Sequence, residues 1–309
     1  MIFDSVICVA PQHLDISLRA IQSHHLFAHP RRIYIVTARR NFTYFENALG
    51  ARLPIQLLDE DKIFNGLTLH NIQEYFIRRI GWSDRAGWYF KQFLNMSMAT
   101  LPDIADHYLV WDSDTVLLQP LNFFSPDGKV LINPKTKIHK PYFDIIRKIL
   151  GLEKQVDYSF ISEHFMVDKC YMQELLDDIA RKTSGKISWF ELILNSIDDQ
   201  ELYGSGFAEY ETYGTYLAFK YRDSFECRPL KSIRNGARHY GTNPSKYDFF
   251  SLMMAGYAFA TFEVWENPSK TQIALSKAVS RIFFLSCSLL SLLTNSYRQR
   301  LAASADLCR

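Results

Sequence analysis

Two aspartates that flank a single serine are the strongest chemical signal in the sequence. Asp112 and Asp114 stand in the stretch YLVWDSDTVLL, residues 108–118, where one apolar run enters an Asp-Ser-Asp triplet and a second apolar run leaves it. The first run is short and bulky, which predicts a buried strand that ends at Asp112. In open α/β sheets ligands bind at the carboxyl ends of strands, where two carboxylates can reach one hard cation. The triplet therefore predicts an Mg²⁺ or Mn²⁺ site beside a phosphate, and a solvated aspartate turn is the simpler alternative.

The elements before the triplet alternate between strand and helix. Apolar runs predict strands at residues 3–10, 32–37 and 54–58, and helical spacing predicts helices at 14–24 and 41–49. This alternation predicts βαβ units, and hence an α/β fold with a mixed, mainly parallel sheet flanked by helices. Neither a GxGxxG nor a GxxxxGK[ST] loop is present, so the sequence supports neither a Rossmann dinucleotide site nor a P-loop.

Polar residues inside apolar segments supply further candidates for a site. Lys91 and Gln92 lie on a predicted helix at residues 87–100, just before the triplet, where they could face a phosphorylated ligand or simply solvent. Glu163 and His164 interrupt an apolar run that we expect to be a strand at residues 159–167. Buried polar groups are unfavourable unless they are paired, so these two residues are either site residues or a satisfied core pair.

An aromatic helix carrying two glutamates is predicted after the Gly-Ser-Gly sequence at residues 204–206. Glu209 and Glu211 alternate there with tyrosines, including Tyr210. Rings can cover the apolar face of a sugar while carboxylates take its hydroxyls, although the same residues would also suit a core helix. His239 lies in a basic stretch at residues 238–241 that we expect to be a loop, and a lone histidine is more often structural than a ligand.

Composition excludes several classes of protein. Of 309 residues 48% are hydrophobic and 15% aromatic, which is ample for a sizeable core and excludes a disordered chain. The net charge of +2 gives no nucleic-acid footprint, so no nucleic-acid partner is expected. Five scattered cysteines without a CxxC pair argue against zinc and against a disulfide framework. With no secretory leader predicted in the first ten residues, these features predict a reducing, cytoplasmic location.

The C-terminal residues are predicted to form a separate helical tail. Pro268 marks a boundary, so we expect one domain at residues 1–267 and a tail at 268–309. The apolar segment 282–293 has Arg281 before it and Arg298 and Arg300 after it, and it is shorter than the ~18 apolar residues that a membrane span needs. It is either a core helix or a surface for peripheral contact with the inner face of a membrane.

Five motifs together resemble the glycosyltransferases of the GT-A fold. They are YLVWDSDTVLLQPL, GWYFKQFLNMS, SFISEHFMV, FAEYETYGTY and RHYG, and the resemblance covers roughly residues 3–265. Among these enzymes the chain is most similar to bacterial polysaccharide and lipopolysaccharide-type transferases of an uncharacterised, DXD-containing family. The resemblance implies a Rossmann-like GT-A sheet and a nucleotide-sugar donor.

The resemblance also implies roles for individual residues. Asp112 and Asp114, completed by His239, would hold Mn²⁺ or Mg²⁺ against the donor diphosphate, and Glu209 or Glu211 would act as base in an inverting reaction. Which glutamate acts, and whether the enzyme inverts or retains, stays open. The residues expected to contact the donor are Val9, Ala10, Pro11, Thr37, Lys91, Gln92, Trp111, Asp112 and Ser113. The residues expected to contact the acceptor or the sugar are Glu163, His164 and Tyr210.

The function expected on these grounds is metal-dependent transfer of a sugar, from a donor that is UDP-linked by analogy, to a glycan or lipid-linked acceptor in cell-surface polysaccharide synthesis. Departure of the nucleoside diphosphate builds charge on the β-phosphate, which a cation can stabilise. One alternative is a sugar-phosphate nucleotidyltransferase, which would have a glycine-rich basic loop after the first strand, whereas residues 9–14 contain no glycine. The other is a non-catalytic carbohydrate-binding protein, which would tolerate loss of both aspartates.

Overall fold

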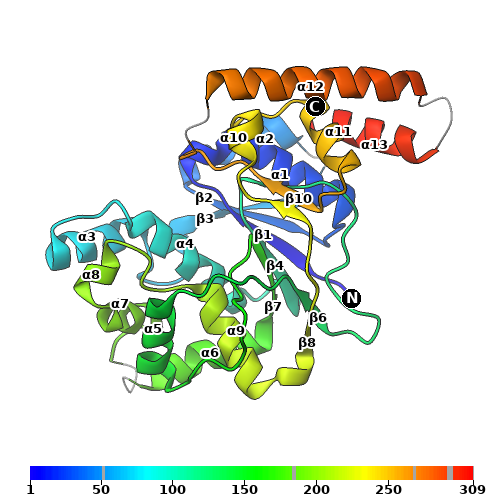
Figure 1. Ribbon diagram of the computed structural model, residues 1–309. Coiled ribbons are helices and arrows are strands. Elements are labelled where there is room, and N and C mark those ends of the chain that lie inside the picture. The colour runs from blue at the N-terminus through cyan, green and yellow to red at the C-terminus, as the bar shows by residue number, and fades with distance from the viewer. Residues whose placement is uncertain (51–52, 183–185, 267–268, 291–294, 309) are drawn as a thin grey trace.

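A mixed five-stranded sheet forms the centre of the fold. The computed structural model describes residues 1–309 except 51–52, 183–185, 267–268, 291–294 and 309 (Figure 1). The strand order is β3-β2-β1-β4-β7, and every neighbouring pair is parallel except β4 and β7. This confirms the predicted α/β class with a mainly parallel sheet. The strands are β1 (Asp4–Cys8), β2 (Ile33–Thr37), β3 (Ile55–Asp59), β4 (His107–Trp111) and β7 (His164–Asp168).

Helices cover both faces of this sheet. Figure 1 shows α1 and α2 on one side and α4, α6 and α9 on the other. The α-helices described before residue 221 are α1 (Leu14–Phe27), α2 (Phe42–Leu49), α3 (Leu69–Ile80), α4 (Ala86–Ser97), α5 (Lys140–Leu150), α6 (Lys169–Arg181), α7 (Trp189–Ser196), α8 (Asp199–Leu202) and α9 (Glu209–Lys220). Short 3-10 turns lie at Pro11–His13, Arg39–Asn41, Glu60–Lys62, Met98–Thr100 and Arg222–Ser224.

The strand that leads into the Asp-Ser-Asp triplet is buried along almost its whole length. Tyr108 to Trp111 are each at most 1% exposed, which explains why this stretch is uniformly bulky and apolar. The strand ends one residue earlier than expected, at Trp111. The amide of Asp112 donates to the carbonyl of Glu163 at 3.0 Å, and the amide of Thr115 donates to the carbonyl of Asp112 at 3.1 Å, which closes a turn around the triplet.

A second, smaller sheet holds the other side of the triplet. Its strands are β5 (Thr115–Leu117), β10 (Phe259–Thr261) and β9 (Ser232–Ile233), in the order β5-β10-β9. The hydroxyls of Thr115 and Thr261 lie 2.8 Å apart, and the amide of Phe262 donates to the carbonyl of Asp114 at 2.9 Å. A two-stranded sheet pairs β6 (Val130–Ile132) with β8 (Phe225–Cys227). The backbone of the triplet is thus fixed by Glu163 and Phe262, two residues that are distant from it in the sequence.

Several predicted boundaries differ from the structure. The expected strand at residues 159–167 begins only at His164, and the expected loop at 238–241 is largely helical, in α10 (Gly236–Tyr240). The region from residue 246 divides into α11 (Lys246–Met254) and β10. The C-terminal helices α12 (Lys270–Leu290) and α13 (Asn295–Asp306) lie at the top of the molecule, near α10 and α11 (Figure 1). The predicted end of the apolar segment, residues 291–293, lies outside the described residues.

Candidate active site

A cleft with a volume of about 500 Å³ opens beside the carboxyl end of β4. This volume lies within the range that small-molecule sites occupy, ~300–1,000 Å³. Side chains from the loop after β4, from α4, from the start of α9 and from the segments around β9 and β10 converge on it. The lining residues are Arg85, Trp88, Lys91, Gln92, Asp112, Tyr142, Ile161, Ser162, Ser205, Ala208, Glu209, Tyr210, Arg234 and Trp265.

The first aspartate of the triplet forms an ion pair within this cleft. The Lys91 ammonium, carried by α4, contacts Oδ1 of Asp112. Burial favours the neutral amine, but the carboxylates of Asp112, Glu209 and Asp114 together outweigh that effect, and the pKa of Lys91 is raised. Lys91 therefore stays protonated and places a fixed positive charge beside the end of β4.

The second aspartate is nearly buried and faces a histidine. Oδ2 of Asp114 lies 3.4 Å from Nδ1 of His13, and that nitrogen has no hydrogen-bond partner among the described residues. Burial and the neighbouring Asp112 carboxylate raise the pKa of Asp114 to about 7. A cation bound beside Asp114 would favour its ionised carboxylate.

His13 was not among the residues predicted from the sequence. It ends the 3-10 turn that follows β1, and β1 pairs in parallel with β4, so both strands end at the same edge of the sheet. That relation is the signal that could have found it, because polar residues just after neighbouring parallel strands share one edge. Burial and the nearby Lys91 ammonium lower the pKa of His13, which favours the neutral imidazole.

Asp112 and Asp114 could supply two ligands to a divalent cation, and the described residues add no third His, Cys, Asp or Glu ligand. His239 does not join them: it lies on α10, where its Nδ1 is 3.5 Å from Nε2 of Gln272, and it does not line the cleft. Across the described part of the chain, no group of three His, Cys, Asp or Glu side chains could hold a metal ion. However, Mg²⁺ is commonly held by one or two carboxylates together with substrate phosphates and water, and the two aspartates suit that mode.

The structure separates the two candidate glutamates. Glu209 is the first residue of α9 and lines the cleft, where its Oε1 accepts a hydrogen bond from Nδ2 of Asn95 at 2.9 Å. Burial raises the pKa of Glu209. Glu211 does not line the cleft; its Oε2 accepts from the hydroxyl of Ser159 at 2.6 Å and from the amide of Phe160 at 3.1 Å. Glu211 thus fixes the loop before β7, and only Glu209 faces the cavity.

The walls of the cleft are aromatic and amide-bearing. Gln92 accepts from the amide of Glu209 at 3.1 Å through Oε1, while Tyr210 lies beside it with a hydroxyl that has no partner in the described part of the chain. Arg234 and Trp265 are among the lining residues that sequence reasoning missed. Arg234 bonds Glu263 through Nε at 3.2 Å, and the indole of Trp265 is 67% exposed at the cleft. Only the return of β9 and β10 to β5 brings these two residues here.

Other predicted donor residues lie near the sheet edge but do not line the cleft. The Thr37 hydroxyl donates to the carbonyl of Val9 at 2.8 Å, and Nε1 of Trp111 donates to the carbonyl of Thr115 at 2.7 Å. Ala10 and Pro11 follow β1 at the same edge, and Ser113 is buried between the two aspartates.

The two polar residues predicted near the acceptor also lie outside the cleft lining. Glu163 is buried, and its Oε2 lies 3.4 Å from Nζ of Lys135. His164 packs between the rings of Trp111 and Phe259, and burial lowers its pKa to about 3.

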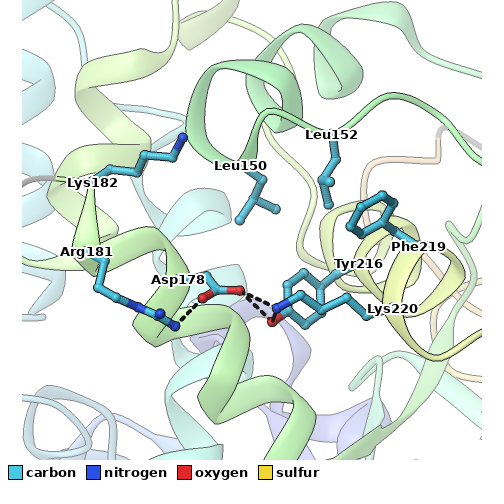
Figure 2. Close-up of a pocket in the computed structure, with 8 residues that line it drawn as sticks. All are labelled: Leu150, Leu152, Asp178, Arg181, Lys182, Tyr216, Phe219 and Lys220. Carbon is cyan, nitrogen blue, oxygen red and sulfur yellow. Dashed lines mark hydrogen bonds and ion pairs between the residues drawn. The ribbon is translucent and has the colours of Figure 1, made fainter.

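A separate pocket of about 340 Å³ lies at the opposite end of α9 (Figure 2). Leu150, Leu152 and Phe219 form its apolar wall. Its carboxylate, Asp178, is already bound by Arg181, Lys220 and the hydroxyl of Tyr216. None of the residues predicted to act in chemistry lines this pocket, and its charges serve to tie α6 to α9.

Comparison with protein families matches residues 10–229 to a family described as "Family of unknown function (DUF6492)", and the chain belongs to that family. No curated protein matches the sequence.

Among solved structures, mouse xyloside xylosyltransferase 1 in its apo form is 12% identical over 84% of this chain and 97% of its own, with a TM-score of 0.44. Galactosyltransferase LgtC in complex with donor and acceptor sugar analogs is 12% identical over 96% and 99%, with a TM-score of 0.42. The apo glycosyltransferase GlyE of Streptococcus pneumoniae TIGR4 is 10% identical over 98% and 62%, with a TM-score of 0.40. At these scores we transfer no residue role from them.

Proposed function

We propose that this member of the DUF6492 family is a GT-A-type glycosyltransferase that moves a sugar from a nucleoside-diphosphate donor, UDP-linked in the first instance, to a hydroxyl of a glycan or lipid-linked acceptor. One observation supports this above the others. A cleft of sugar size at the carboxyl end of β4 brings together Asp112, the Lys91 ammonium and the buried carboxylate of Glu209, with aromatic rings as walls. In this cleft Lys91 would face the anionic leaving group, Glu209 would act as the base, and the aromatic rings would bind the sugar.

The donor end of the reaction is assigned to the residues around the triplet. Asp112 and Asp114 would hold Mn²⁺ or Mg²⁺, which when bound neutralises charge on the diphosphate. Lys91 adds a positive charge that its ion pair with Asp112 holds in place, so it needs no reorganisation as the diphosphate departs. The turn after β1, with Ala10, Pro11 and His13, borders the same edge and would take the nucleotide.

The acceptor end is assigned to Glu209. Its raised pKa brings a carboxylate closer to the range of a general base, and Asn95 holds one of its oxygens in place. In the proposed step the carboxylate takes the proton of the acceptor hydroxyl, the hydroxyl oxygen bonds to the anomeric carbon, and the bond from that carbon to the diphosphate breaks. A base acting directly on the acceptor entails inversion at the anomeric carbon.

The wider setting follows the resemblance of the sequence. We propose that residues 1–267 form the catalytic domain and 268–309 an appended helical tail, and that the product belongs to a cell-surface polysaccharide. Within the described residues no helix combines the length and hydrophobicity that crossing a bilayer requires.

A donor panel tests the proposal. Purified protein is incubated with UDP-, GDP- and TDP-sugars in Mn²⁺, Mg²⁺ or EDTA, and release of the nucleotide is measured with and without saccharide acceptors. We expect metal-dependent release with one donor, loss of at least about a hundredfold in Asp114→Asn, and no loss in Asp127→Asn, which changes an exposed turn carboxylate. A folded protein that binds none of these donors in the presence of metal would overturn the proposal.

A matched pair of glutamate variants tests the assignment of the base. Glu209→Gln should lower kcat by roughly 10²–10⁴-fold with little change in melting temperature. Glu211→Gln should instead lower the melting temperature, because it weakens the bonds to Ser159 and Phe160. The opposite pattern would assign the base to Glu211.

A further inference from the structure

The outer face of α12 carries five exposed large hydrophobic side chains. Helical periodicity places one stripe of its side chains outward, and each side chain of this stripe is more than half exposed. The stripe consists of Leu275, Val279, Ile282 and Leu285, which are 66%, 58%, 65% and 54% exposed. Phe283 borders it at 40%. Contiguous apolar stripes of this kind mark interaction sites on soluble folds.

The opposite face of the same helix is fixed to the protein body. Ser280 and Cys287 are buried, and Phe284 packs against the rings of Tyr247 and Phe250 of α11 at 4.9 and 5.1 Å. The helix therefore cannot turn its apolar stripe inward. Figure 1 shows α12 running along the outer edge of the molecule, beyond α10 and α11.

An apolar groove continues this stripe toward α11. It has a volume of about 460 Å³, and Tyr240, Met254, Leu275, Val279 and Phe283 are among the residues that line it. Such a groove can accept a hydrocarbon chain that a flat helix face could not hold.

The charge of α12 indicates which kind of partner binds its apolar face. Residues 270–290 contain Lys270, Lys277 and Arg281 and no aspartate or glutamate. Helices that combine an apolar face with basic residues lie in the interface of anionic bilayers. A second copy of the chain is a poorer occupant, because a twofold contact through α12 would set these like charges against each other.

We propose that α12 docks the protein on an anionic lipid surface, with the stripe Leu275–Leu285 in the interface and the groove beside α11 taking an acyl chain. This surface differs from the one expected from the sequence, since it begins at Leu275 and its described part ends at Leu285. Arg300 is not one of its flanks, because Nη1 of that residue donates to the carbonyl of Met253 at 3.1 Å.

Membrane docking would also define the acceptor class, a step that rests on the proposed function. Trp265 lines the catalytic cleft and stands only five residues before Lys270, the first residue of α12. A membrane lying against α12 would therefore bring lipid-linked saccharides close to the rim of the cleft. Docking through α12 would thus favour a lipid-linked acceptor over a free glycan.

Vesicle co-sedimentation without any donor tests the docking separately from catalysis. The full chain is mixed with phosphatidylcholine vesicles with or without phosphatidylglycerol, at low and high salt. We expect binding only to the anionic vesicles, weaker at high salt. Leu275→Glu with Ile282→Glu should weaken it by about tenfold for each apolar side chain removed. Lys270→Gln with Arg281→Gln should weaken it about fivefold per charge.

Ile77→Glu is the control, because Ile77 is also an exposed apolar residue, 55% exposed, and lies on α3, apart from α12 (Figure 1). It should bind vesicles as the unchanged protein does. Absence of binding to anionic vesicles, or equal binding by the Leu275→Glu/Ile282→Glu variant, would overturn the proposal. A dimer in size-exclusion chromatography with light scattering that this variant converts to a monomer would assign the stripe to a second copy instead. Donor hydrolysis measured on the same samples shows independently whether the transferase proposal holds.

Discussion

Two buried histidines predict that the fold loses stability in mild acid. His24 and His164 are almost completely buried, and burial lowers the pKa of each to about 3. In the unfolded chain each should titrate near 6.5, so below that pH the unfolded state binds protons that the folded state excludes. Above pH 6.5 the two histidines therefore do not reduce the free energy of unfolding. Below pH 6.5 this free energy falls as the pH drops toward 3. The loss is about 1.4 kcal/mol per pH unit for each histidine, or about 2 kcal/mol each at pH 5.

The variant His164→Phe isolates half of this effect. Neither ring nitrogen of His164 has a hydrogen-bond partner in the described part of the chain, and its neighbours Trp111, Phe123 and Phe259 are aromatic. A phenyl ring removes two buried polar atoms and keeps the packing, so at pH 7.5 the free energy of unfolding should change by less than ~1.5 kcal/mol. Between pH 7.5 and 5 the variant should lose about 2 kcal/mol less than the unchanged protein.

Urea unfolding followed by tryptophan fluorescence at pH 7.5, 6 and 5 measures both quantities. His70→Gln is the control, because the His70 side chain is 76% exposed and the substitution removes a histidine outside the core. An identical pH dependence in His164→Phe and the unchanged protein would refute the reasoning. If His164→Phe keeps its stability but loses sugar transfer, the role in sugar binding predicted from the sequence would gain support instead.

Three further predictions concern packing, the cleft and thiol reactivity. Gly214→Ala should lower stability by ~1–3 kcal/mol in urea unfolding, because a Cβ there would lie 2.2 Å from Cγ of Phe160, whereas Gly87→Ala has open space around it and should not. Trp265→Ala should raise the KM for the acceptor by roughly fivefold, equivalent to ~1 kcal/mol of lost ring contact, without changing the melting temperature; an unchanged KM would remove Trp265 from the acceptor site. Burial raises the pKa of Cys8 to about 12, so mass spectrometry after iodoacetamide at pH 8 should find the exposed Cys170 modified and Cys8 unmodified until urea is added.

Local periodicity predicts much of this fold because its first part is built from neighbouring segments. The strands predicted at residues 32–37 and 54–58 form β2 (Ile33–Thr37) and β3 (Ile55–Asp59), and the helix predicted at 41–49 forms α2 (Phe42–Leu49). The alternation before residue 60 is sufficient to predict a mainly parallel sheet. The stretch at residues 238–241 was expected to be a loop from its glycine and basic residues, but it forms most of α10, which packs against α12.

The candidate site is only partly predictable for a related reason. Asp112, Lys91 and Glu209 were singled out because each stands in a recognisable local pattern, and the cleft brings all three together. His13 and Trp265 carry no such pattern. They reach the site through the parallel pairing of β1 with β4 and the antiparallel pairing of β5 with β10, which are relations between distant segments. His239 was predicted as a ligand only from the resemblance to the GT-A enzymes, and its place on α10 beside α12 could not be read from its neighbours in the sequence.

The pairing of β5 with β10 also determines when the triplet can reach its final geometry during synthesis. Thr115 is made 146 residues before its partner Thr261. At ~5–20 residues per second a ribosome needs on the order of ten seconds or more to cover that distance. Through this interval β1 to β4 can already form, while the carbonyl of Asp114 still lacks the amide of Phe262. The nascent chain thus carries most of the central sheet while the backbone of the candidate site is unfinished, and that backbone is completed only when Phe262 has been made.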